Sequence, residues 1–218
     1  MSRRRVADER RKEIIAGLYE CLESVGYQEL TIKSIARAAN VSYGALHYFF
    51  KNKKEIVFAF VEDYTREAED RFRKSVVDIE SAPARLKAMV SFLVQEMVLK
   101  SKINKVFLNL HHMACCDDDI RGCMRRCHEA YRRGIREVIE YGIRRGEFPK
   151  IDTATFAFLM VGTVEGVSLQ ISMNPELLNV KKVEKLFYHV ARRLLIGEET
   201  LSHLSRLAGE EPLKNLLR

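Results

Sequence analysis

Apolar residues recur along the chain at the three- and four-residue spacing of amphipathic helices. Residues 7–25, for example, place Ile14, Leu18 and Leu22 on one stripe. No Val/Ile/Thr-rich alternating segment of the kind that forms strands stands out, and only four prolines and eleven glycines interrupt 218 residues. The sequence therefore predicts an all-α protein.

The predicted helices form a short N-terminal group and a longer remainder. Three helices at 7–25, 31–38 and 42–49 are followed by a long fourth helix that starts near Asn52. After a break at Ser-Ala-Pro, further helices are predicted at 84–101, 103–115, from the Asp turn at 117–119 to about Arg145, and at 152–173, 180–196 and 198–217. We therefore expect a head of residues 1–53 and a larger body of residues 54–218.

The longest apolar stretch, residues 155–173, has Glu165 near its middle. A charge at that depth is costly in a bilayer, so we expect a buried core helix and no membrane span. The basic start of the chain is not followed by an uninterrupted apolar run, so no secretory signal is expected. The five cysteines are then free thiols by default, which favours a cytoplasmic location.

Positive charge is concentrated near the start of the chain. The net charge is +7, and residues 1–60 contain 11 Lys and Arg against 7 Asp and Glu. Such a basic unit suits a polyanionic partner, either nucleic acid or an anionic membrane surface.

Residues 31–49 have the pattern of a helix-turn-helix. Thr31 and Ser42 are suited to cap the two helices, and Asn40 tolerates the left-handed conformation of a tight turn. In this motif the second helix lies in the major groove of DNA, while cations and helix N-termini hold phosphates. A helical scaffold that does not bind DNA remains an alternative, because such shapes also occur without that function. The residues that we expect to contact DNA are Thr31, Lys33, Ser42, Tyr43, Gly44, His47, Tyr48, Lys51 and Lys53.

The same stretch resembles the DNA-binding head of the TetR family of bacterial transcriptional regulators. The positions that match the family's pattern are Thr31, Ile35, Ala36, Ala39, Val41, Ser42, Gly44, Leu46, Phe50 and Lys53. The chain departs from the pattern at Asn40, where Gly is usual, at His47, where Tyr is common, and at Phe49, where Tyr or His is common. The resemblance implies a ligand-responsive regulator, a repressor that binds a pseudo-palindromic operator of double-stranded DNA as a dimer. A small-molecule effector would release it from that operator.

The helix around Glu165 is apolar nearly all round and must be covered on more than one side. In the TetR family the last two long helices pair with their copies in a second subunit as a four-helix bundle, so we expect a homodimer. The alternative is that these helices pack only within one chain. The predicted interface residues are Gly162, Gly166, Leu186, Phe187, Val190 and Leu194.

The resemblance also implies a small-molecule pocket between the middle helices. Glu165 is the strongest candidate for a ligand contact, because a carboxylate in so apolar a helix needs a cation, a hydrogen-bond donor or water beside it. The full set of predicted ligand-binding residues is Phe92, Met97, Phe107, His111, Met113, Phe158, Glu165 and Gln170.

Residues 111–128 concentrate His and Cys. His111 with Cys115, and Cys123 with Cys127, are spaced by one helical turn, and a hairpin between them could form a four-ligand zinc site. Cys-x-x-Cys pairs are absent, however, and small cysteines fill cores well. We therefore expect no metal and no cofactor, with a metal- or thiol-responsive regulator as the alternative. Nucleophile-elbow, P-loop and dinucleotide glycine motifs are also absent, so we do not expect an enzyme.

Overall fold

The computed structural model describes residues 3–24, 29–99, 101–174, 176 and 179–208. These residues form helices joined by short turns and contain no strand, which confirms the all-α prediction. The head contains α1 (Arg3–Ser24), α2 (Ile32–Ala38) and α3 (Tyr43–Phe49). The remaining elements are α4 (Lys53–Val76), α5 (Ala82–Val94), a π-helical turn η1 (Gln95–Leu99), α6 (Ser101–Ala114), α7 (Asp118–Arg144), α8 (Thr153–Met173) and α9 (Val180–Ala208).

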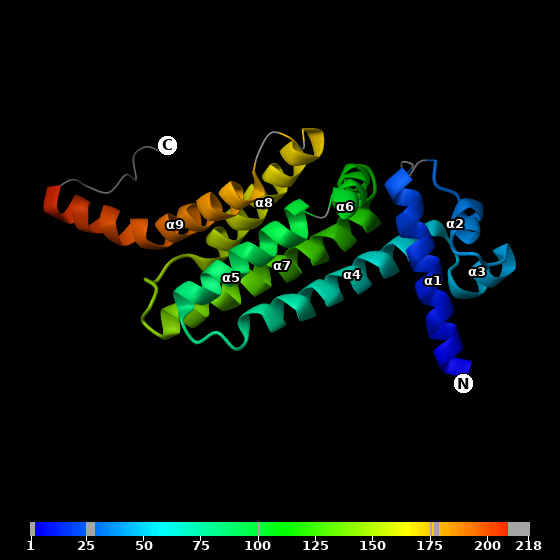
Figure 1. Ribbon diagram of the computed structural model, residues 1–218, viewed down its shortest axis with the longest axis horizontal. Helices are drawn as coiled ribbons and strands as arrows, with labels where there is room; N and C mark the ends of the chain where they lie inside the picture. The colour runs from blue at the N-terminus through cyan, green and yellow to red at the C-terminus, as the bar shows by residue number, and fades with distance from the viewer. Residues whose placement is uncertain (1–2, 25–28, 100, 175, 177–178, 209–218) are drawn as a thin grey trace.

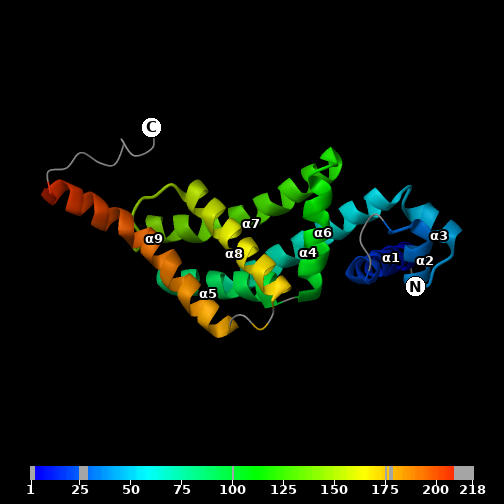
Figure 2. The same ribbon diagram turned by 90° about the horizontal axis from the view of Figure 1, so that it is seen from above.

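The molecule is elongated, with the head at one end (Figure 1). Helix α4 runs from the head into the body, where it packs against α7. In both views α6 lies between the head and the rest of the body, and α9 extends away at the opposite end (Figure 2). Helix α6 also contacts α1, so it is a body element that meets the head directly.

Local side-chain bonds explain where the head helices begin and turn. Thr31 caps α2 in a reciprocal pair: its hydroxyl accepts from the Ser34 amide at 3.0 Å, and its own amide donates to the Ser34 hydroxyl at 3.1 Å. Asn40 takes the left-handed conformation with φ 52°, which turns the chain toward α3. Ser42 then caps α3 by accepting from the Ala45 amide at 3.1 Å.

Two hydrophobic clusters make up the core. The first joins the head to the beginning of α4, to α6 and to the start of α7, and includes the fully buried Ile35, Leu46, Ile56 and Leu110. The second lies between α5, the rest of α7, α8 and α9. The predicted boundary at residue 53 therefore falls within a continuous core, and the division into residues 1–53 and 54–218 stays a prediction.

Two predicted helices differ from the observed ones. The helix expected over 84–101 changes to a π-helical turn after Val94, which places the carboxylate of Glu96 inside the body. The break expected after residue 196 is absent, because α9 continues to Ala208 and a single glycine costs a helix only about 1 kcal/mol. The end of the predicted tail helix, residues 209–217, lies outside the described residues.

Helix α8 is long and apolar enough, by length and composition alone, to cross a membrane, and 33% of its most apolar window is buried inside the protein. The core helix of a soluble protein has a similar length and composition, but it is mostly buried. The exposed apolar side of α8 is nevertheless unfavourable in water unless another surface packs against it, and it is described below with the candidate functional surfaces.

Candidate DNA-binding surface and effector cavity

Helix α3 presents its predicted contact residues to the surface and keeps its apolar side in the core. Leu46 is completely buried, whereas the side chains of Tyr43 and Tyr48 are 52% and 83% exposed. Exposed apolar side chains that are grouped on one face mark interaction sites on soluble proteins, whereas isolated ones do not. The structure groups five of the predicted residues on this face or at its edge, namely Ser42, Tyr43, Gly44, His47 and Tyr48.

Within this face the rings are held by one another. Tyr43 and His47 meet edge to face with their ring centroids 4.5 Å apart. Gly44 lies between them in sequence, and a Cβ atom built on it would meet nothing within 4 Å. The protein's own packing therefore does not require glycine at this position.

The predicted phosphate-binding residues occupy two kinds of position. Thr31, Lys33 and Lys51 are exposed next to the α3 face. Lys53 is half-buried, and its ammonium group donates a hydrogen bond to the Leu30 carbonyl at 3.1 Å. Lys53 therefore has an internal partner within the head, whatever it contacts on DNA.

A cavity of about 290 Å³ opens between α4, η1, α6, α7 and α8. Four of the predicted ligand-binding residues line it: Met97, Phe107, His111 and Glu165. The other lining residues are Tyr64, Glu96, Ile103, Asn104, Leu108, Cys127, His128, Tyr131, Gly166, Ser168 and Leu169.

The other four predicted ligand-binding residues lie elsewhere. Phe92 lines a second cavity of about 280 Å³ between α4, α5 and α7. Met113 is buried in the core cluster shared by head and body. Phe158 is 65% exposed, and Gln170 is also exposed, both on α8.

One end of the cavity contains a buried carboxylate, Glu96, that was not among the predicted site residues. Glu96 is only 4% exposed, and its Oε1 accepts hydrogen bonds from the Tyr64 hydroxyl at 2.8 Å and from the Arg71 guanidinium. Burial and the neighbouring charges raise the pKa of Tyr64 well above its usual value, so this phenol stays a donor. The only sequence signal was a lone acid among apolar neighbours, the same signal that identified Glu165.

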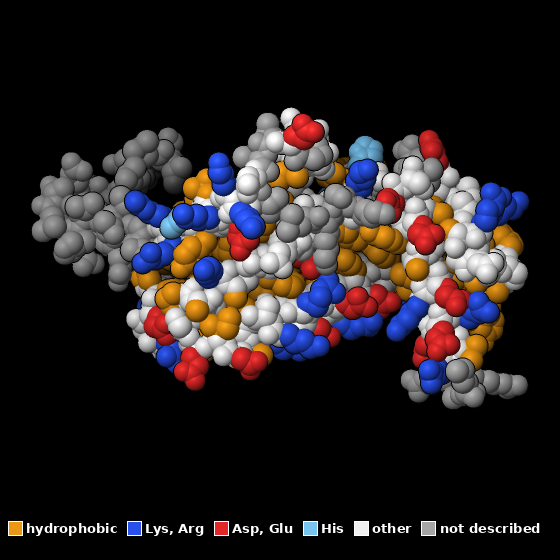
Figure 3. All heavy atoms as spheres, viewed as in Figure 1, with side chains coloured by type: hydrophobic (Ala, Val, Ile, Leu, Met, Phe, Trp, Pro, Cys, Tyr) orange, Lys and Arg blue, Asp and Glu red, His pale blue; other side chains and the backbone are white. Residues whose placement is uncertain are grey.

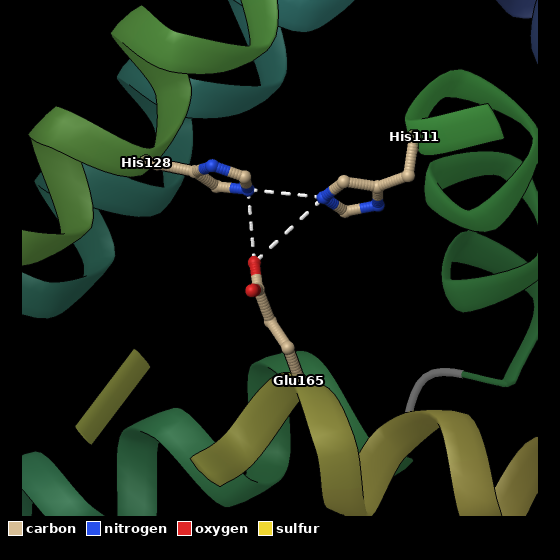
Figure 4. A group of neighbouring side chains, drawn as sticks. All are labelled: His111, His128 and Glu165. Carbon is tan, nitrogen blue, oxygen red and sulfur yellow. Dashed lines mark hydrogen bonds and ion pairs between the residues drawn. The ribbon is translucent and has the colours of Figure 1, made fainter. Parts of the chain in front are cut away.

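The other end of the cavity contains three converging side chains from three helices, His111 of α6, His128 of α7 and Glu165 of α8 (Figure 4). The Nε2 atoms of the two histidines are 3.0 Å apart. Glu165 Oε1 lies 2.9 Å from Nε2 of His128 and 3.8 Å from Nε2 of His111. His111 and Glu165 were predicted site residues, but their contact was not predicted, and His128 was missed as their partner.

The protonation states of two members follow from their surroundings. Burial lowers the pKa of His111, an effect that the Glu165 charge only partly offsets, so this imidazole is neutral at neutral pH. Burial alone would raise the pKa of Glu165. The hydrogen bond from His128 and the surrounding positive electrostatic environment outweigh that effect and lower the pKa of Glu165 below its usual value. The carboxylate is therefore ionised.

The cysteines do not join this group. Cys123 and Cys127 are buried on the inner side of α7, and burial raises the pKa of Cys127 to about 11. Cys115 follows the end of α6 and is exposed. The four-ligand arrangement of His111 with Cys115, Cys123 and Cys127 is therefore wrong: in the described part of the chain, the one group that brings three such ligand atoms together is His111, His128 and Glu165.

Helices α8 and α9 expose most of the large apolar side chains. Seven of the eleven exposed large hydrophobic residues in the described part of the chain belong to these two helices. They follow helical stripes, and Figure 3 shows apolar side chains reaching the surface along α9 between Lys and Arg. We call this surface the α8–α9 stripe; it consists of Phe158, Leu159, Leu169, Met173, Leu186, Val190 and Leu194.

The predicted interface residues divide around this stripe. Leu186, Val190 and Leu194 belong to it, and Gly162 is exposed beside it with nothing within 4 Å of a built Cβ atom. Gly166 is half-buried with equal room, and it also borders the cavity. Phe187 is only 7% exposed, because it points into its own body cluster, so it is not available to a second subunit in this structure.

Comparison with known proteins adds two family matches. Residues 14–60 match the model of the bacterial regulatory proteins of the tetR family. Residues 82–195, more than half of the chain, match the C-terminal model of BetI-type transcriptional repressors.

Individual relatives agree with these matches. The chain is 28% identical over 172 residues to the HTH-type transcriptional regulator TtgR of Pseudomonas putida, covering 74% of this chain and 79% of that protein. It is 24% identical over 188 residues to the HTH-type transcriptional regulator BetI of Klebsiella pneumoniae, covering 85% and 94%. Its fold resembles that of a transcriptional regulator from Saccharomonospora viridis in complex with choline, with a TM-score of 0.75 and 20% identity over 86% of this chain and 98% of that chain.

Proposed function

Because the chain belongs to the TetR family of bacterial transcriptional regulators, we propose that it is a repressor that binds a pseudo-palindromic operator as a homodimer. Membership of the family makes it a ligand-responsive transcriptional regulator with a helix-turn-helix DNA-binding domain. The observation that carries the finer proposal is the exposed face of α3, where two tyrosines and His47 surround an unobstructed glycine.

The DNA-binding proposal follows from what this face offers. A recognition helix enters the major groove with its N-terminal residues toward base edges, and Ser42, Tyr43 and Gly44 form that end of α3. Lys33 and Lys51 lie beside it as exposed cations that suit phosphates. We assign base contacts to Tyr43 and His47, and backbone contacts to Thr31, Lys33 and Lys51. Tyr48 is exposed on the same face, and Lys53 adds charge from its position against Leu30.

The homodimer proposal is supported by the α8–α9 stripe. Exposed large apolar side chains along two helices are typical of a subunit interface, and a second copy of the same stripe would cover them symmetrically. Gly162 leaves room for close approach of another backbone. A dimer also places two α3 helices about 34 Å apart on DNA, one helical turn, as a palindromic site requires.

The cavity between α4, η1, α6, α7 and α8 is the proposed effector site. Its volume is at the small end of the range of ligand pockets, roughly 300–1,000 Å³, which favours a compact effector. The rings of Tyr64, Phe107 and Tyr131 provide flat apolar walls. Glu96 and Glu165 contribute carboxylates, and the described residues that line the space include no Lys or Arg, so a free anion fits poorly. The regulator from S. viridis was solved with choline, a small cation, which agrees with this preference.

A route from the cavity to the head is visible in the contacts of α6. The Asn109 side chain donates to the Leu22 carbonyl of α1 at 3.4 Å. Lys54 in the first turn of α4 pairs with Asp117 at 2.6 Å and with Asp119 at 3.2 Å, at the start of α7. An effector that shifts α6 would therefore act on α1, and one that shifts α7 would act on the start of α4. A coupling free energy of about 1–3 kcal/mol would weaken operator binding roughly 5- to 150-fold.

DNA binding and its release by an effector involve no bond-breaking chemistry, and we propose that the protein acts without enzymatic activity in the cytoplasm, where its DNA is. Its relatives TtgR and BetI are transcriptional regulators. A metal- or thiol-responsive form of the same regulator is a second candidate because His111, His128 and Glu165 converge at the cavity.

Selection of bound fragments from random duplex DNA tests the proposal. We expect a palindromic sequence that binds with nanomolar affinity, above a background that falls steeply with salt. A library of small metabolites is then screened for release of that fragment. Recovery of no enriched sequence, or binding to all duplexes with equal affinity, would contradict the assigned role of α3.

A further inference from the structure

Three lone-pair donors meet at one point where α6, α7 and α8 come together. One potential ligand atom from each of His111, His128 and Glu165 lies within 4.8 Å of the other two. Figure 4 shows both imidazoles directing Nε2 at the same carboxylate oxygen and at each other. A proton on Nε2 of His128 is donated to Glu165 in a hydrogen bond. The lone pair on Nε2 of His111 then faces an N–H group that already has an acceptor. A cation between the three atoms satisfies all of them at once.

We propose that His111, His128 and Glu165 bind one divalent transition-metal ion of the Zn²⁺ class. The donor set of two imidazole nitrogens and one carboxylate oxygen is of intermediate softness, which suits Zn²⁺, Co²⁺ and Ni²⁺ better than Mg²⁺ or Ca²⁺. The site extends beyond the proposed effector role of the cavity, because metal binding requires neither DNA nor an organic ligand.

The distances are those that one small ion requires. Ligand atoms that share a tetrahedral Zn²⁺ at about 2.1 Å lie roughly 3.4 Å apart. The three observed separations of 2.9, 3.0 and 3.8 Å fall on both sides of that value. Only small side-chain rotations are needed to make them equal.

The side chains are also oriented as ligands. A metal ion binds through the lone pairs of imidazole nitrogens and carboxylate oxygens, and Figure 4 shows these atoms of His111, His128 and Glu165 directed at one another. The Phe107 carbonyl accepts a hydrogen bond from the His111 ring. Because Nε2 faces the group, this bond falls to Nδ1, and an outer hydrogen bond of that kind fixes the orientation of a metal-binding histidine.

Three protein ligands leave one position of a four-coordinate ion open. All three residues line the cavity, so the open position faces that space and is accessible to water or to a donor atom of an effector. A metal here would also fix α6 relative to α8, and α6 contacts α1 of the head. This regulatory consequence rests on the proposed function, whereas the metal site does not.

The test is a metal titration of the full-length protein after treatment with chelator. We expect calorimetry with Zn²⁺ to give one ion per chain, and Co²⁺ to produce the visible absorption bands of a nitrogen- and oxygen-bound ion. Millimolar Mg²⁺ should not compete. His111→Ala, His128→Ala and Glu165→Gln should each weaken the binding by at least about 10- to 100-fold, the range found when a metal site loses a supporting group.

His112→Ala is the matched control, because His112 is exposed on the same helix and should leave binding unchanged. Cys127→Ser tests the thiol alternative and should also retain the Co²⁺ spectrum. Circular dichroism and thermal melts of each metal-free variant show whether it is folded. Glu165→Gln is nearly the same size as the native residue and keeps the test valid if an alanine variant fails to fold.

Three results would overturn the site: no saturable binding of Zn²⁺, Co²⁺ or Ni²⁺ below millimolar concentration, binding that survives all three site variants, or binding that only Cys127→Ser removes. None of these bears on operator binding, which is measured separately on DNA. Conversely, if the protein binds Zn²⁺ through these residues but enriches no DNA sequence, the metal-site proposal stands and the repressor proposal is contradicted.

Discussion

Gly17 and Gly44 lie in the same small head but for different physical reasons. A Cβ atom on Gly17 would lie 2.7 Å from the Ala39 amide nitrogen, so glycine lets α1 approach the end of α2. A Cβ atom on Gly44 would meet nothing within 4 Å, and glycine is a poor helix former. Gly44 therefore reduces the stability of α3 without any packing benefit inside the chain, which indicates a close approach by something outside it.

Gly44→Ala should therefore separate stability from DNA binding. We expect the free energy of unfolding to stay constant or rise by about 0.5–1 kcal/mol, because alanine favours the helix. The affinity for the selected operator should fall by about tenfold or more, equivalent to about 1.4 kcal/mol. Thermal denaturation and fluorescence anisotropy measure the two effects. Gly17→Ala is the contrasting variant and should lower the free energy of unfolding. An operator affinity that Gly44→Ala leaves unchanged would contradict the placement of α3 in the major groove.

Lys51 and Lys53 should respond differently to alanine, because the Lys53 ammonium group has an acceptor inside the head and Lys51 is exposed. Lys51→Ala should leave the melting temperature unchanged and reduce the slope of log K against log salt by about 0.9, the value for a single phosphate. Lys53→Ala should lower the free energy of unfolding by about 1 kcal/mol, since the Leu30 carbonyl loses its donor. Binding measured between low and high salt distinguishes them, and identical slopes for Lys51→Ala and the native protein would argue against a phosphate contact.

At the scale of elements, α3 is too short to be stable alone. Its seven residues are held by the Ser42 cap at one end and by burial of Leu46 and Phe50 at the other. Ser42 also lies at the N-terminal end of α3, the end that we place toward DNA. The two roles have opposite requirements for charge, because a carboxylate caps a helix as well as a hydroxyl does but repels DNA.

Ser42→Asp and Ser42→Ala use that opposition. Ser42→Asp should keep the melting temperature and lose operator affinity, because the cap remains and the new carboxylate repels DNA. Ser42→Ala should lower the free energy of unfolding by about 1 kcal/mol through loss of the bond to the Ala45 amide. Chemical denaturation and anisotropy on the same samples give both quantities. If Ser42→Asp binds DNA as tightly as the native protein, the N-terminal end of α3 does not lie against DNA.

The elements that could be predicted from the sequence are those whose signals are local. The caps at Thr31 and Ser42 and the turn at Asn40 are each set by neighbours within four residues, and all three are present. The π-helical turn after Val94 could not be predicted, because its apolar pattern fits an ordinary α-helix and Glu96 is placed by Tyr64 and Arg71 of α4.

The cavity shows the same limit. Glu165 was conspicuous as the one charge of an apolar helix, but its partners lie 37 and 54 positions earlier in the chain, at His128 and His111. No spacing rule connects residues on three different helices, so the local one-turn spacing of His111 with Cys115 suggested the wrong set. Tertiary packing decides which of the neighbouring histidines and cysteines point inward.

At the scale of the whole molecule, the head lies at one end of the long axis, and α9, which carries part of the α8–α9 stripe, lies toward the other end (Figure 1). Helix α6 borders the cavity and also contacts α1 of the head. Helix α8 borders the cavity through Glu165 and carries part of the stripe on its outer side. A ligand in the cavity therefore touches both the helix that meets the head and the helix that would set the distance between two heads.

Val190→Asp should disrupt the proposed dimer and with it the binding of a palindromic operator. Val190 is 42% exposed within the stripe, and a carboxylate there would have to be buried against the second copy, which is costly without a partner. Val77→Asp is the matched control, because Val77 is 53% exposed at the end of α4, away from the stripe. Sedimentation at micromolar concentration should show a monomer for the first variant and a dimer for the second. Operator affinity should fall only for the monomeric variant, because the operator's two half-sites must then bind two independent heads. A native protein that sediments as a monomer would contradict the dimer, and the apolar stripe would then bind a different partner.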